Sequence, residues 1–223
     1  EIGSLFGYPV TDSLGRISLR IVEQPDSTVP AATGWIKIFP RRMTIEPQGQ
    51  QTVRLLVSPP PGITDGEYWA RLVIIARGGQ LPITSAEDSS GVRVGLTVEV
   101  RTIIPLLYRK GKVATGAELS ALRAAREGDS IVVRGRLARR GNAALLGTVR
   151  GELVDSKGRV RSGFVSPISA YYPLEPRFAL PIDSVPAGNY RLRVEVSSGR
   201  KDLAPESVLP FRTIRDSVMV ELR

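Results

Sequence analysis

Apolar and polar residues alternate along most of the chain. Strict alternation places one set of side chains in a core and the other in solvent, which is typical of a half-buried β-strand. Runs of this kind recur from the first twenty residues to the last five, and they predict strands throughout the sequence. The clearest are Ile17–Ile21, Trp35–Ile38, Val92–Val94, Leu96–Val100, Ile131–Arg134, Tyr190–Val196 and Val218–Leu222.

Turn-forming residues separate these runs at short intervals. The chain contains 22 Gly and 17 Pro, and many of them stand in pairs such as Asp65-Gly66, Gly78-Gly79 and Gly141-Asn142. Many short strands with this punctuation are typical of a sandwich or barrel, and they argue against a doubly wound α/β fold. We therefore predict an all-β protein.

One segment fits two structures. Thr115-Gly116-Ala117-Glu118 has the form of a helix capping box, and Leu119, Leu122 and Ala125 share a helical face. A strand fits the same place, because a second sandwich needs a first strand there. We favour the strand for residues 115–127.

The sequence also repeats a short motif. Gly66-Glu67-Tyr68 and Gly188-Asn189-Tyr190 each follow a turn and lead into an alternating run. A Tyr at this place in Ig-like sandwiches bonds back across a corner, although Gly-x-Tyr is also a common way to enter any strand. With the number of strands, the repeat favours two tandem Ig-like sandwiches, at residues 1–110 and 111–223, joined near Lys110-Gly111-Lys112.

Composition removes most catalytic chemistry. The 223 residues include no His and no Cys, so His-dependent catalysis, thiol nucleophiles and the usual zinc ligands are all excluded. Glu87-Asp88 offers too few carboxylates for calcium, and we interpret it as a loop. Asp65 and Glu67 stand beside a turn, where carboxylates more often accept backbone hydrogen bonds than transfer protons. We expect no enzyme activity, no metal and no cofactor.

Positive charge is concentrated in the second half. The formal charge is +9, of which residues 1–110 carry 12 basic and 10 acidic residues and residues 111–223 carry 19 and 12. Arginines at alternate strand positions share a face, so each pair forms a basic stripe. These stripes are either solvated surface or contacts to a polyanion, and without interleaved aromatic residues we expect no nucleic-acid binding. The candidate residues are Arg134, Arg136, Arg159, Arg161, Arg191 and Arg193.

Three segments in order resemble one family. Thr44–Leu55 has the form of a turn followed by a strand that begins with Val-Arg. Ile63–Leu72 has the form of an acidic turn followed by an aromatic strand. Val94–Arg109 has the form of a last strand that ends in Tyr-Arg. In this order and spacing they resemble the N-terminal Ig-like domain of PapD-like periplasmic pilus-assembly chaperones. The second half matches that family poorly and is similar to a general bacterial Ig-like module.

The resemblance implies a binding mechanism. In such chaperones the last strand of the first domain is an exposed edge that pairs with an incomplete subunit. The matching partner-strand residues here are Leu96, Val98, Val100 and Arg101, although the three apolar ones would also suit this chain's own core. The family's carboxylate-binding Lys corresponds to Pro105, and no basic residue in Glu1–Val10 replaces its Arg. Capture of a terminal carboxylate is therefore not predicted.

These observations favour a non-catalytic protein that works outside the cytoplasm. The chain begins with Glu1 and has no long apolar run, so we expect export to the periplasm or cell surface after removal of a signal peptide, and no transmembrane segment. We predict chaperone-like or scaffolding binding to a pilin-like or other envelope protein through a strand edge. The alternatives are a structural subunit of a filament or membrane-associated complex and a polyanion-binding surface module.

Overall fold

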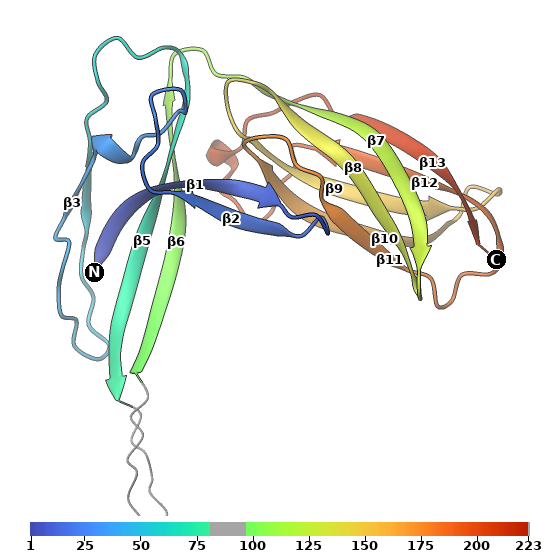
Figure 1. Cartoon of the computed structure of the whole chain (residues 1–223), viewed down its shortest axis with the longest axis horizontal. Helices are drawn as coiled ribbons and strands as arrows, with labels where there is room; N and C mark the ends of the chain where they lie inside the picture. Colours follow the sequence, from blue (N-terminus) through green and yellow to red (C-terminus); the bar gives the residue numbers. More distant parts are fainter. Residues whose placement is uncertain (81–96, 223) are drawn as a thin grey trace, which may run out of the picture. The chain divides into compact units, whose positions relative to one another are not determined.

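The computed structural model describes residues 1–80 and 97–222 (Figure 1). Strands make up 60% of the structure and helix 3%, which confirms the all-β prediction. Two single-turn 3₁₀ helices, Thr33–Trp35 and Pro205–Ser207, are the helical segments of the described part. The strands are β1 (Ile2–Thr11), β2 (Ile17–Val22), β3 (Ile36–Phe39), β4 (Arg54–Val57), β5 (Gly66–Gln80), β6 (Thr97–Lys110), β7 (Thr115–Glu127), β8 (Ser130–Gly141), β9 (Leu145–Val154), β10 (Val160–Ala170), β11 (Arg177–Pro181), β12 (Gly188–Ser197) and β13 (Ile214–Leu222).

Contacts divide the described chain into two compact units. Unit 1 comprises Glu1–Phe6, Val22–Ile63 and Trp69–Leu106, and unit 2 comprises Gly7–Ile21, Thr64–Tyr68 and Leu107–Arg223. Several strands therefore contribute residues to both units. Neither unit is one continuous segment of the chain. The division into two domains at residue 110 therefore stays a prediction.

Unit 1 has a small core. In it β1 pairs antiparallel with β5, with Ile2 opposite Ile74, and β3 pairs with β4 in a separate two-stranded sheet. Phe6, Ile38 and Trp69 are its largest fully buried side chains. The larger sheet has the strand order β2-β1-β5-β6 and includes residues of both units, with β6 at one end and β2 at the other.

Unit 2 contains a sandwich of two sheets. The strand orders are β10-β9-β12-β13 and β11-β8-β7, and neighbouring strands pair antiparallel. Alternate apolar residues of both sheets, among them Ile131, Leu153 and Leu192, meet in one shared core. Residues 115–127 form strand β7, as predicted, with a bulge between Ser120 and Arg123.

The two Gly-x-Tyr motifs form the same corner. The Tyr68 hydroxyl donates a hydrogen bond to the carbonyl of Thr64 (3.0 Å), and the Tyr190 hydroxyl donates one to the carbonyl of Pro186 (2.7 Å). In both, the acceptor lies four residues before the tyrosine. The repeat noticed in the sequence is therefore a structural repeat and confirms the predicted tyrosine corner.

A second repeat was missed in the sequence. Asp12–Arg16 and Asp155–Arg159 read Asp-Ser-x-Gly-Arg and form turns with the same hydrogen bonds. In each, one aspartate oxygen accepts the backbone N–H groups two and four residues on, at 2.8–2.9 Å. Gly15 and Gly158 have φ of +77° and +79°, where a side chain would be strained. The motif thus specifies a tight hairpin between β1 and β2 and between β9 and β10.

A buried ion pair holds the start of β5 and the end of β6 within unit 2. The Glu67 carboxylate accepts a hydrogen bond from Arg109 Nε (2.8 Å) and another from the backbone N–H of Ala144 (2.9 Å). The Arg109 guanidinium also donates to the carbonyls of Glu206 and Ser207. Glu67 is only 1% exposed, so these hydrogen bonds help to replace the water that its carboxylate loses on burial.

We expect the Tyr190 corner to contribute more stability than the Tyr68 corner. Tyr190→Phe should lower the free energy of unfolding by about 1 kcal/mol, because the carbonyl of Pro186 loses its donor in a partly buried place. Tyr68→Phe should cost less, because water can replace its exposed hydroxyl. Urea denaturation of both variants measures the difference. A larger loss for Tyr68→Phe would contradict this ranking.

Removal of Arg109 should be far more damaging than removal of an exposed arginine. Arg109→Met leaves the Glu67 carboxylate buried without its cation, which typically costs about 3–5 kcal/mol. The matched control is Arg136→Met, whose exposed ion pair with Glu175 spans 3.8 Å and should contribute less than about 1 kcal/mol. Urea denaturation compares the two, and equal stability of the two variants would show that the Glu67 charge is compensated in another way.

Candidate functional site

Strand β6 is the candidate binding edge. It lies at the end of the sheet β2-β1-β5-β6 and pairs with β5 on one side (Figure 1). On its other side no backbone hydrogen bond reaches Val98–Leu107 within the described chain. Open N–H and C=O groups of this kind are a template on which another strand can pair.

The edge is apolar as well as open. All residues from Val98 to Pro105 are exposed, and Val98 and Val100 are 40% and 55% exposed. Ile103 and Ile104 are each 40% exposed. Val98 and Val100 therefore do not belong to the buried core of the described structure, and about half of each side chain is open to solvent or to a partner.

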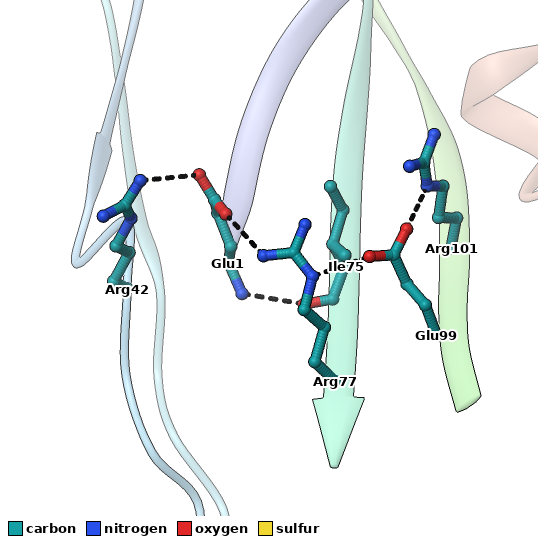
Figure 2. A network of polar contacts seen from close by, with 6 residues as sticks. All are labelled: Glu1, Arg42, Ile75, Arg77, Glu99 and Arg101. Carbon is teal, nitrogen blue, oxygen red and sulfur yellow. Dashed lines mark hydrogen bonds and ion pairs between the residues drawn. The ribbon is translucent and has the colours of Figure 1, made fainter. Parts of the chain in front are cut away.

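The opposite face of the same strand carries charge (Figure 2). Glu99 accepts hydrogen bonds from Arg77 Nε on β5 and from Arg101 Nε on β6, both at 2.6 Å. Because side chains alternate along a strand, Glu99 and Arg101 point away from the face of Val98 and Val100. From Val98 to Arg101 the edge thus has one apolar and one charged face.

This charged network extends across the sheet to the first residue. Arg77 also contacts the Glu1 carboxylate (3.4 Å), which in turn contacts Arg42 (3.3 Å), and the N-terminal ammonium donates to the carbonyl of Ile75 (2.8 Å). The hydrogen bond from Arg77, and to a smaller extent the one from Arg101, lowers the pKa of Glu99. Glu99 therefore stays ionised and holds both guanidinium groups in place at neutral pH.

The predicted partner-strand residues are mostly on this edge. Val98, Val100 and Arg101 lie on β6, whereas Leu96 lies outside the described residues. Arg101 forms an ion pair with Glu99, and Arg109 forms one with Glu67, so both arginines of β6 already have a carboxylate partner. Sequence analysis missed Arg77 and Glu1, because nothing in their spacing indicates that they meet Glu99.

The six arginines of the predicted stripes differ in their surroundings. Arg159 and Arg161 both bind Asp155 at 2.9 Å. Hydrogen bonds from Arg159, Lys157 and Arg161 hold the pKa of Asp155 well below its usual range. Arg134 contacts Glu127 (3.5 Å) and Arg136 contacts Glu175 (3.8 Å). Arg191 and Arg193 have no ion pair or hydrogen bond among the contacts of the described chain.

The remaining carboxylates do not gather into a site. Asp65 accepts a hydrogen bond from the backbone N–H of Lys112 (2.9 Å), and Glu67 accepts one from Ala144, which confirms the expected backbone role of this pair. Glu87 and Asp88 lie outside the described residues. Within residues 1–80 and 97–222, no three acidic side chains are placed to hold a metal ion. The same residues include no helix with the length and apolarity to cross a bilayer.

The chain has a distant similarity to a solved structure. No protein-family model matches the sequence, and no curated protein matches it. Among solved structures, the chain is similar to one from a chaperone–tip adhesin complex that is vital for synergistic activation of CFA/I fimbriae biogenesis. The similarity covers 94% of this chain and 84% of that chain, with 14% identity and a TM-score of 0.33. Similarity at this level assigns neither a family nor an activity.

Proposed function

We propose that this protein is a non-catalytic chaperone-like or scaffolding protein that binds another envelope or surface protein by pairing β6 with a strand of its partner. One observation carries the proposal: β6 ends its sheet with an open backbone and exposed valines on one face. The order of the three PapD-like segments in the sequence supports the same mechanism. It also supports a periplasmic or surface location and a pilin-like or other envelope partner.

The two faces of β6 define the partner strand. Main-chain hydrogen bonds provide affinity for any strand, and pockets for alternate side chains provide specificity. A strand beside β6 meets Val98 and Val100 on one face and the pair Glu99–Arg101 on the other. The partner strand should therefore carry apolar residues at the alternate positions that meet the valines. At the positions that meet the Glu99–Arg101 pair it should carry polar, uncharged residues. Pro105 has no N–H to donate, so pairing is best served by the stretch before it.

Composition supports the non-catalytic part of the proposal. The chain has neither His nor Cys, so the usual general base and thiol nucleophile are missing. The acidic residues beside the turn, Asp65 and Glu67, are engaged by backbone N–H groups. A role in assembly needs only the open edge and a stable body beneath it.

A structural subunit is the second candidate, and the other end of the same sheet favours it. Strand β2 ends the sheet opposite β6, and Ile17, Leu19 and Ile21 on one of its faces are 46%, 36% and 42% exposed. A sheet that is open at both ends can take one neighbour at each, as a filament requires. Purified assemblies distinguish the candidates, because a structural subunit occurs in them at fixed stoichiometry whereas a chaperone keeps a free pool.

The β6 edge can be tested by one substitution. Val98→Lys should reduce recovery of the partner at least about tenfold, because pairing would bury an ammonium group against apolar side chains. The measurement is quantitative mass spectrometry of proteins that co-purify with the tagged chain from the cell envelope of its own organism. Circular dichroism should show unchanged strand content.

The matched control is Val165→Lys. Val165 is 59% exposed on β10, which ends a different sheet, so this variant adds the same charge at another exposed edge position. It should recover the partner as the unmodified chain does. If the Val98→Lys variant recovers the partner as fully as the unmodified chain does, β6 is not the binding edge. If Val98→Lys and Val165→Lys both lose the partner to the same extent, the added charge explains the loss.

A further inference from the structure

The outer face of the sheet β10-β9-β12-β13 carries a lattice of charges. Strand β12 lies between β9 and β13, and residues that face each other across neighbouring strands share one side of the sheet. Glu195 of β12 lies opposite Arg150 and Arg215, and Arg193 lies opposite Glu152 and Ser217. Arginines of three strands are thus brought to one surface.

Two of these arginines keep their charge available. Glu195 is engaged by Arg215 (2.7 Å) and Glu152 by Arg150 (3.7 Å). Arg191 and Arg193, by contrast, have no partner within the part of the chain that the structure describes. In the stripe of Arg159 and Arg161, the carboxylate of Asp155 takes both guanidinium groups. Sequence alternation alone cannot distinguish these two stripes.

The unpaired arginines line a hollow. A depression of about 560 Å³ lies on this face within unit 2, with Arg150, Arg191, Arg193 and Arg215 in its lining. Three carboxylates, of Glu152, Glu195 and Asp216, lie in the same lining. Arg150 holds Glu152 and Arg215 holds Glu195. Arg191, Arg193 and Asp216 remain without an ion pair in the described chain, so the hollow keeps a net positive charge on the β12 side.

We propose that Arg191 and Arg193 bind a phosphate group in this hollow. Alternate residues of a strand are about 6.6 Å apart, so two guanidinium groups can converge on one anion from the same side. A phosphate presents several oxygens in a tetrahedron and carries up to two negative charges, which suits two arginines. A carboxylate has two oxygens in one plane and is matched by a single arginine.

Two carboxylates of the lining oppose the site: Asp216, which no arginine holds within the described chain, and Glu152. Glu152 lies directly opposite Arg193 across the β9–β12 ladder, where a like charge repels an incoming anion. The site is exposed, so binding should weaken as salt screens it. Removing the Glu152 charge should therefore strengthen phosphate binding, whereas a purely structural surface would show no response of this sign.

The test is a titration of the whole chain with inorganic pyrophosphate. Calorimetry measures the affinity, and the NMR chemical shifts of the β12 amides report where the probe binds. The double variant Arg191→Gln/Arg193→Gln should bind at least about tenfold more weakly, since it loses two charge-assisted contacts. Glu152→Gln should bind more tightly. The control is Arg159→Gln/Arg161→Gln, which removes the same net charge from guanidinium groups that Asp155 already holds and should bind as the unmodified chain does.

Vesicle binding distinguishes two possible sources of the phosphate, a lipid headgroup and a free phosphate compound. Binding to phosphatidylcholine vesicles that contain phosphatidylglycerol, lost in the Arg191/Arg193 double variant, assigns the site to lipid headgroups. Pyrophosphate binding without vesicle binding assigns it to a free phosphate compound. Absence of saturable binding to both probes overturns the proposal, as does an equal loss in the two double variants, which would reduce the effect to net charge.

Discussion

The open backbone at the end of a β-sheet is the constraint on which this structure depends. Each N–H and C=O group on an edge strand needs a partner or water, and natural proteins usually protect edges with charge, proline or a covering segment. Strand β6 contains Glu99, Arg101 and Pro105, all of them protective residue types. However, the two charges neutralise each other on one face. The other face therefore keeps its exposed valines, and the edge remains able to pair.

The ion pairs of this protein mainly decide where charge remains available. Most are exposed, and such pairs typically contribute about 0–1 kcal/mol each. Asp155 illustrates their effect, because it fixes a turn and at the same time occupies Arg159 and Arg161. Glu67 does the same for Arg109 in a buried setting, where the pair has large structural consequences. On β12, by contrast, Arg191 and Arg193 have no such partner within the described part of the chain, so their positive charge stays available.

Local features of the fold could be predicted from sequence, and contacts between distant segments could not. The alternation in Tyr190–Val196 reports which face is buried, and Gly-x-Tyr reports a corner, because both depend on neighbouring residues. The Asp-Ser-x-Gly-Arg turns are equally local and were visible at Asp12 and Asp155. The pairing of Glu67 with Arg109, by contrast, depends on how two strands are brought together. For the same reason, alternation predicted the arginine stripes but not which of them meets a carboxylate.

The two ends of one sheet separate the two functional classes in physical terms. A strand edge is saturated by a single added strand, so a chaperone that binds one subunit at a time needs one open edge. A subunit of a continuous assembly needs a second edge, because it must receive a neighbour as well as offer itself to one. Here both β6 and β2 end the sheet, with Val100 and Ile17 about half exposed. Occupancy of β2, rather than of β6, therefore decides between transient binding and permanent assembly, since both functions use β6.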